Sequence, residues 1–392
     1  MATAILTTAT DEMHAGHGAF PQRIAPKDNR RTTDRAETSP MTPSTPSTPS
    51  DSTASAAPTV PGPAPAPDDA ARVAPPPDPL APEDALALPL PPAARPAPGV
   101  ELLRGTHFAF RPRLRPLAMD LWLPEDRAEP VPLVVFVHGG GWRAGRRDDL
   151  GPRFRSWEPG PFARLAQEGV AVACPEYRLS GEAVAPAQVE DVTEALAWLG
   201  ARSGELGVDP GRAVLWGESA GGHLAAMAAL APAYHHLLMP LEPEEPTGVT
   251  VTGCVTWYAP TDLRHFGTDH PLSRFDPRDP SSSEARMLGV APADDTKRAR
   301  ANSPAALASA DAPPFLILHG REDTSVAPKQ AERLADALRA AGAQADLRLV
   351  DGADHRWEGL SEEALQGCWE ATAAFVRART GLADGTGGGA MK

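Results

Sequence analysis

The stretch that decides the fold is Ala213–Ala231, AVLWGESAGGHLAAMAALA. It starts with an apolar run typical of a buried strand and ends with alanine-rich helical sequence. Between the two, Ser219 stands two residues from both Gly217 and Gly221, the spacing of the G-x-S-x-G turn in which a strand reverses sharply into a helix. Such a turn exposes the serine hydroxyl at a helix N-terminus, where backbone amides favour negative charge. The stretch therefore predicts a nucleophile at Ser219, although the motif alone fits an ordinary loop or helix cap equally well.

Composition divides the chain into three parts. Residues 1–98 contain 21 of the 45 prolines and almost no aromatic residues, so we expect a disordered or polyproline-like extension that cannot bury enough apolar surface to offset its ordering entropy. Residues 99–380 are long enough for one large domain with a sizeable core. The glycine-rich residues 381–392 are expected to form a flexible tail.

Charge and cysteine usage exclude several classes of function. A net charge of −14 without a basic stripe argues against a nucleic-acid partner. Cys174, Cys254 and Cys368 lie far apart in the sequence, which favours buried free thiols over a disulfide or a metal site. No apolar run approaches the ~20 residues of a membrane span, and the first residues lack the features of a signal peptide. We expect a cytoplasmic protein without a membrane partner, and the sequence leaves its oligomeric state open.

Short apolar runs alternate with helical patterns through the second part. Residues 189–204 and 328–343 space their apolar side chains about 3.6 residues apart, as amphipathic helices do. Five apolar runs are predicted as strands covered on both faces: 132–140, 169–179, 212–219, 251–260 and 314–323. This alternation predicts an α/β fold with a mostly parallel central sheet and helices on both faces.

Two further regions complete the predicted architecture. Residues 106–114 and 117–125 are expected to form an antiparallel hairpin at one edge of the sheet. Residues 232–247 and 262–312 are rich in Pro, Asp and Ser, and we expect loops or a small cap over the strand ends.

Polar residues follow several of the predicted strands, and the carboxyl ends of parallel strands share one edge of a sheet. A serine nucleophile needs a histidine base and an acid that orients the histidine, and the chain order serine, acid, histidine is a known one. His355 follows the stretch ADLRLVDGAD, residues 345–354, whose apolar part is also predicted as a strand, and it ends a Gly-Ala-Asp-His turn; His319 is its competitor. We therefore expect Ser219 and His355 to act together, with either Glu322 or Asp323 as the acid.

A second motif, VFVHGGGWRAG, covers residues 135–145. Its three successive glycines allow backbone amides to approach a ligand closely, and such amides can stabilise a tetrahedral oxyanion. The alternative interpretation is a flexible turn. Trp142 is expected either to line an acyl pocket or to belong to the core, and His138 to be structural. Structural roles are also expected for Glu218, Tyr177, Arg178 and Asp191.

Three segments carry a resemblance to a known family: residues 138–150, HGGGWRAGRRDDL; residues 216–227, WGESAGGHLAAM; and residues 311–343, which begin DAPPFLILHGRED. Over roughly residues 100–380 the chain resembles the α/β-hydrolase superfamily, and in particular the hormone-sensitive-lipase-like and BD-FAE-like carboxylesterases. The resemblance implies a nucleophile, an acid and a base at Ser219, Asp323 and His355. It also implies an oxyanion hole formed by the amides of Gly140, Gly141 and Ala220.

The chain departs from the family pattern at two places. It has Val326-Ala327-Pro328 where Val-Pro is usual, and Asp354 where a glycine is common. Neither departure removes a catalytic group, so both concern local geometry only.

The function implied by the resemblance is hydrolysis of short-chain carboxylic esters through an acyl-enzyme, with a small-molecule ester as partner and no cofactor or metal. Alternatives are an arylformamidase that cleaves N-formyl amides, and a feruloyl or acetyl esterase acting on esters derived from plant polysaccharides. A binding protein without activity on the same fold is a further alternative, because a fold does not determine a function. In a last alternative, the main role of the protein lies in the proline-rich extension, residues 1–98, which would dock a partner.

Overall fold

The computed structural model describes residues 84–230, 247–269 and 275–382. The extension expected up to residue 98 therefore lies outside the described residues as far as residue 83, and the expected tail lies outside them from residue 383. Part of the first expected cap segment, residues 232–246, is likewise not described.

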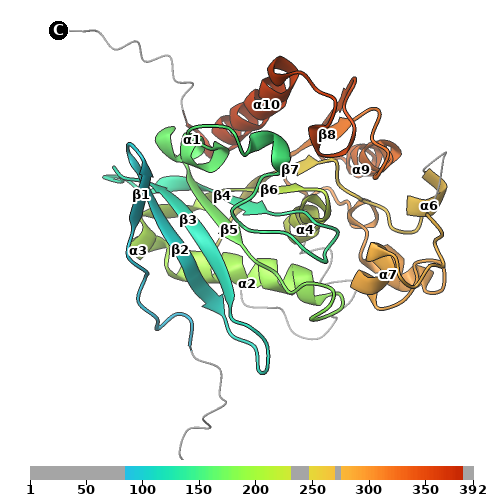
Figure 1. The fold of residues 1–392 in the computed structure, drawn as a ribbon, viewed down its shortest axis with the longest axis horizontal. Helices are drawn as coiled ribbons and strands as arrows, with labels where there is room; N and C mark the ends of the chain where they lie inside the picture. Colours follow the sequence, from blue (N-terminus) through green and yellow to red (C-terminus); the bar gives the residue numbers. More distant parts are fainter. Residues whose placement is uncertain (1–83, 231–246, 270–274, 383–392) are drawn as a thin grey trace, which may run out of the picture. The chain divides into compact units, whose positions relative to one another are not determined.

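The strands of the described residues form one nine-stranded sheet in the order β1-β2-β3-β5-β4-β6-β7-β8-β9 (Figure 1). From β5 to β9 neighbouring strands are parallel, whereas β1, β2, β3 and β5 pair antiparallel. The mostly parallel sheet and the hairpin near one edge are thus confirmed, with β1 added outside the hairpin. The strands are β1 Ala94–Ala97, β2 Val100–Ala109, β3 Leu117–Pro124, β4 Val131–Val137, β5 Ala171–Pro175, β6 Val208–Glu218, β7 Val251–Trp257, β8 Phe315–Gly320 and β9 Ala345–Val350.

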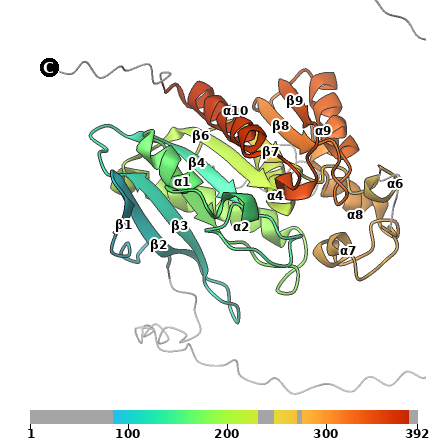
Figure 2. The same ribbon diagram turned by 45° about the horizontal axis from the view of Figure 1, so that its top comes forward.

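Helices cover both faces of the sheet (Figure 2). Successive side chains of β4 point to opposite faces: Val135 packs in one core cluster and Phe136 in the other. The Phe136 face is covered by α1 Pro161–Gln167 and α10 Glu362–Thr380. The Val135 face is covered by α2 Ala187–Ala201, α3 Ser203–Leu206, α4 Ala220–Ala229 and α9 Lys329–Ala340. The chain runs from β4 to its neighbour β5 on one side and from β6 to its neighbour β7 on the other. The connections therefore leave the carboxyl ends of the adjacent strands β4 and β6 in opposite directions. Open α/β sheets bind ligands at such a point.

The second expected cap segment, residues 262–312, consists of short helices joined by loops where the structure describes it, and its residues 270–274 lie outside the described residues. Between β7 and β8 it contains α6 Phe266–Asp269, α7 Ser283–Leu288, α8 Thr296–Ala301 and the 3₁₀ turn η2 Pro304–Ala306. Two more 3₁₀ turns, η1 Pro152–Phe154 and η3 His355–Trp357, follow β4 and β9. The fold is that of the α/β-hydrolases.

The three cysteines Cys174, Cys254 and Cys368 are free and buried, which confirms the expected thiol state. Among the described residues, no helix combines the length and apolar character that crossing a membrane requires.

The expected boundary at residue 98 is corrected by the structure, because residues before it pack on the domain. Ala85 is buried, and its carbonyl accepts a 3.3 Å hydrogen bond from the Trp198 indole. The Arg202 guanidinium donates to the carbonyls of Leu86 and Leu88, and β1 pairs with β2. Composition averaged over a proline-rich segment missed these few contacts, most of which use backbone groups rather than apolar side chains.

The corrected boundary predicts that a chain beginning at residue 99 melts below one beginning at residue 84. It loses several hydrogen bonds of about 1 kcal/mol each, and roughly 1 kcal/mol shifts the Tm of a large domain by about 2–4 °C. We expect a decrease in Tm of roughly 5–10 °C by calorimetry, with the chain from residue 84 matching the full-length protein. Equal Tm values for the two shortened chains would contradict the packing of residues 84–98.

Candidate active site

Ser219 lies between the end of β6 and the start of α4, with φ 51° and ψ −123°. This backbone conformation is strained for a residue with a side chain. The turn is so tight that a β-carbon on Gly217 would overlap the carbonyl of Gly221, and one on Gly221 would overlap the carbonyl of Val137. Only glycine fits at both positions, so the structure has the strand, turn and helix that the sequence predicted.

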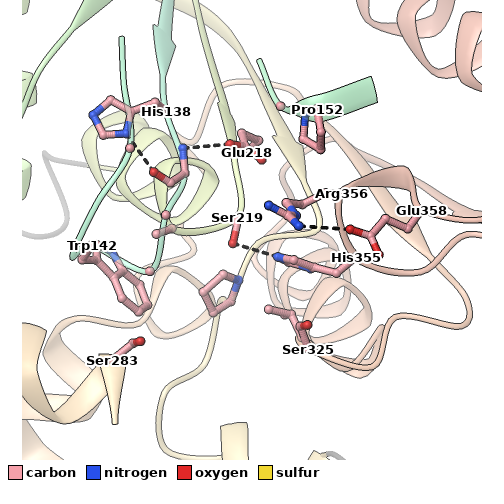
Figure 3. A pocket seen from close by; sticks show the side chains of 18 of the residues that line it. His138, Trp142, Pro152, Glu218, Ser219, Ser283, Ser325, His355, Arg356 and Glu358 are labelled. Carbon is pink, nitrogen blue, oxygen red and sulfur yellow. Dashed lines mark hydrogen bonds and ion pairs between the residues drawn. The ribbon is translucent and has the colours of Figure 1, made fainter. Parts of the chain in front are cut away.

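The structure brings Ser219, His355 and Asp323 together. Figure 3 shows Ser219 and His355 pointing toward each other, with Oγ 3.1 Å from Nε2. On the other side of the imidazole, Nδ1 lies 2.8 Å from Oδ2 of Asp323, whose side chain is fully buried. A carboxylate can only accept there, so Nδ1 carries the hydrogen and the Nε2 lone pair faces the serine hydroxyl. The arrangement can move a proton from Ser219 to His355.

Asp323 is held as an anion by its surroundings. Its Oδ1 accepts the backbone N–H groups of Ser325, at 2.9 Å, and Val326, at 2.8 Å. Burial opposes ionisation, but hydrogen bonds from His319 and His355 outweigh it and hold the pKa of Asp323 well below its usual range. The neighbouring Glu322 is exposed to solvent, so the structure brings Asp323 rather than Glu322 to the imidazole.

His319, the competing histidine, is fully buried at the end of β8. Its Nε2 lies 2.8 Å from the carbonyl oxygen of Val326 and 3.3 Å from Oδ2 of Asp323. Both atoms accept, so Nε2 carries the hydrogen. His319 therefore supports the loop that holds Asp323, and it is His355 that contacts Ser219.

The two departures from the family pattern leave these contacts in place. Oδ1 of Asp354 accepts the backbone N–H groups of Thr324 and His355, both at 2.7 Å, so this residue ties the loop after β8 to the turn after β9. The additional Ala327 follows Val326, whose N–H already bonds to Asp323. In this structure Asp354 has a positioning role that glycine could not fill.

Glu218 and Tyr258 form a buried support beneath the site. Glu218 accepts the N–H of Gly139 at 3.0 Å and the hydroxyl of Tyr258 at 2.8 Å. Burial raises the pKa of Glu218, and these two hydrogen bonds oppose that rise. The ring of Tyr258 packs edge-on against His355 with centroids 4.8 Å apart. Sequence reasoning expected a structural Glu218 but missed Tyr258, which it placed inside the predicted strand 251–260, whereas β7 ends at Trp257.

The residues proposed for an oxyanion hole border the same cavity as Ser219. Gly140 and Gly141 have φ values of 113° and 60°, which residues with side chains rarely adopt. Within the part of the chain that the structure describes, the N–H groups of Gly140, Gly141 and Ala220 donate to no acceptor in a loop, turn or cap. No acceptor in the loops, turns and caps of the described residues therefore occupies these three N–H groups.

Trp142 fits both of its sequence interpretations, because it is only 1% exposed and yet lines the cavity. Its indole N–H donates to Nδ1 of His223 at 3.3 Å, while Nε2 of His223 lies 2.9 Å from the carbonyl of Asn302. Burial, partly opposed by that second hydrogen bond, lowers the pKa of His223 to about 4. The ring is therefore neutral at pH 7 and holds Trp142 in one orientation.

The remaining polar residues singled out from the sequence are structural in their contacts. The ring of His138 stacks on Tyr177 at 4.5 Å, and the hydroxyl of Tyr177 donates to the carbonyl of His138. Arg178 forms a buried ion pair with Asp191 on α2. Among the described residues no group of three or more His, Cys, Asp or Glu side chains is arranged to hold a metal ion.

Proteins named as esterases are among those to which the chain is similar. The chain is 28% identical over 268 residues to a probable isoprenylcysteine alpha-carbonyl methylesterase of Oryza sativa, covering 65% of this chain and 58% of the relative. It is 31% identical over 229 residues to the probable carboxylic ester hydrolase LipM of Mycobacterium tuberculosis, covering 56% and 48%. The chain thus spans about half the length of these two curated relatives.

A solved structure and a family model extend the comparison. The propionate-bound structure of Est2, a thermophilic esterase from Thermogutta terrifontis, is 26% identical with a TM-score of 0.56, covering 73% of this chain and 97% of that one. The sequence model of the BD-FAE family matches residues 119–338, which is more than half of the chain and includes the glycine-rich loop, the serine turn and the acid. The chain therefore belongs to the BD-FAE family of the α/β-hydrolase fold.

Proposed function

We propose that this protein is a serine hydrolase that cleaves carboxylic esters of short acyl chains through an acyl-enzyme intermediate. The observation that carries the proposal is the chain of contacts from Ser219 Oγ through the His355 imidazole to Asp323, at the edge of a cavity of about 750 Å³. Hydrolysis of esters is also what the names of the relatives and of Est2 describe for those proteins.

Acylation begins when Ser219 Oγ attacks the ester carbonyl carbon and His355 Nε2 takes its proton. The carbonyl π electrons move to the oxygen, and the amides of Gly140, Gly141 and Ala220 stabilise that oxyanion. When the tetrahedral intermediate collapses, the bond to the alcohol oxygen breaks and His355 returns the proton to the leaving alcohol. Asp323 remains ionised throughout and stabilises the imidazolium.

Deacylation repeats these steps with water as the nucleophile. His355 takes a proton from water as the water oxygen attacks the acyl carbonyl carbon. Collapse of the second tetrahedral intermediate breaks the bond to Ser219 Oγ, which recovers its proton from His355. The acid is released and the enzyme returns to its starting state, so the reaction requires no cofactor.

The cavity wall supports a preference for short acyl groups. Among its lining residues are the hydroxyls of Ser283, Thr324 and Ser325 and the charged side chains of Glu284 and Arg356. A long alkyl chain would have to lie against these groups and desolvate them, which costs free energy. Propionate, which is bound in the Est2 structure, is likewise an acid with a short carbon chain.

Replacing Asp323 with Asn is expected to lower kcat by roughly 10³–10⁴, because the imidazole loses its orienting partner. Ser219→Ala and His355→Ala are expected to have effects at least as large. The matched control is Glu322→Gln, which removes the exposed neighbouring carboxylate and should leave kcat within about twofold. Steady-state hydrolysis of p-nitrophenyl butyrate measures all four variants. A mild Asp323→Asn variant beside an inactive Glu322→Gln variant would move the acid to Glu322.

A panel of p-nitrophenyl esters from acetate to palmitate tests the acyl-chain length. We expect kcat/KM to be highest for acetate or butyrate and to fall steeply beyond about eight carbons, because a longer chain desolvates more of the polar groups in the cavity wall. Methyl ferulate and N-formylkynurenine belong in the same panel. Preference for palmitate would contradict a short-acyl site, and selective hydrolysis of N-formylkynurenine would favour the arylformamidase alternative.

A further inference from the structure

Glu284 is a buried carboxyl in the wall of the Ser219 cavity that the proposed reaction does not use. It lies in the first turn of α7, is 7% exposed, and lines the cavity. The preceding Ser283 lies beside the glycine-rich loop, since its hydroxyl is 3.1 Å from the position of a β-carbon on Gly141. In Figure 3, Ser283 and Trp142 stand on the opposite side of Ser219 from Arg356.

The other charged groups of the cavity wall have partners. Its three arginines form ion pairs, Arg146 with Asp148, Arg155 with Asp149 and Arg356 with Glu358. The carboxylates of Glu218 and Asp354 accept the hydrogen bonds described above.

Glu284 differs from these groups. Within residues 84–230, 247–269 and 275–382, no Lys, Arg or His forms an ion pair with it. Burial raises its pKa to about 7, and that rise is opposed only in part by its own backbone, the charge of Arg143 and the Ser282 hydroxyl. The folded protein therefore leaves part of the cost of burying this charge uncompensated.

A cation inside the cavity would supply the missing partner. An ammonium group beside Glu284 would form a charge-assisted contact at a site largely shielded from water, where such contacts are strong. Trp142 and Phe266 line the same cavity, and aromatic rings attract cations. The net charge of −14 adds a long-range attraction for positive ligands.

We propose that Glu284 binds an ammonium group of the substrate, so that the protein prefers esters carrying a positive charge close to the ester bond. The proposal rests on the proposed ester hydrolysis at Ser219 and adds to it the charge of the substrate. A specificity residue of this kind acts on substrate binding rather than on the transfer of protons.

Pairs of esters that differ only in charge test this inference. One pair is acetylcholine and its neutral isostere in which carbon replaces the nitrogen, with the charge on the alcohol side. The other is the methyl ester of γ-trimethylammoniobutyrate and the corresponding carbon isostere, with the charge on the acyl side. We expect kcat/KM for the cationic member of at least one pair to exceed that of its isostere by roughly tenfold, a typical magnitude for one desolvated charge contact.

The variant Glu284→Gln keeps the shape of the side chain and removes its charge. It should abolish the preference for the cationic ester by lowering kcat/KM for that ester, whereas Glu322→Gln, which removes an exposed carboxylate, should leave the preference and kcat/KM for the neutral isostere within about twofold. No preference in the wild type for either pair, or a preference that survives Glu284→Gln, would overturn the inference.

Direct binding separates a failure of this inference from a failure of the proposed function. Tetramethylammonium and neutral tert-butanol are titrated into the wild-type protein and the Glu284→Gln variant by calorimetry, which requires no turnover. Binding of the cation that weakens about tenfold in the variant supports the site even if no ester is hydrolysed. Hydrolysis of neutral esters without any binding of tetramethylammonium would leave the proposed function standing and overturn the ammonium site.

Discussion

The close approach of α4 to the end of β4 is the constraint on which the rest of the site depends. Gly221 packs so tightly against the carbonyls of Val137 and His138 that no β-carbon fits there. This contact fixes the strained backbone of Ser219, the first amide of α4 and the start of the glycine-rich loop relative to one another. A strained turn persists only where surrounding packing determines it. Here the sheet supplies that packing, since β4 and β6 are paired neighbours near its middle.

Buried carboxylates with complete hydrogen bonding extend this rigidity to the other loops. Glu218 joins the loop after β4 to the residue after β7, and Asp323 joins the loop after β8 to the turn after β9. A satisfied buried polar network holds its members in one geometry, whereas a partly satisfied group carries a cost. Glu284 is the contrasting case, because its partners in the folded protein are neutral or distant. Hydrogen bonding within the protein thus makes Glu218 and Asp323 structural supports, whereas its incompleteness makes Glu284 a candidate contact for substrate.

Sequence patterns predicted the parts of the fold that follow from local chemistry. Strand periodicity, the glycine spacing around Ser219 and the order of polar residues after strands are all visible in one dimension. Only the family resemblance distinguishes Asp323 from Glu322 in the sequence. The two acids differ in burial, since the Asp323 side chain is buried and that of Glu322 is exposed, and a sequence pattern does not show this. Tyr258 and the packing of Ala85 escaped prediction since both depend on contacts between segments far apart in the chain. The same holds for Asp354, whose departure from glycine is explained only by its bond to Thr324.

Covalent labelling by a fluorophosphonate followed by peptide mass spectrometry is the most direct measurement of the proposed nucleophile. An activated serine attacks the phosphorus and displaces fluoride, whereas an ordinary surface serine reacts far more slowly. The expected result is a single adduct on Ser219 that disappears in Ser219→Ala and forms far more slowly in His355→Ala. Folded wild-type protein that forms no adduct, or an adduct that persists in Ser219→Ala, would contradict a nucleophile at Ser219.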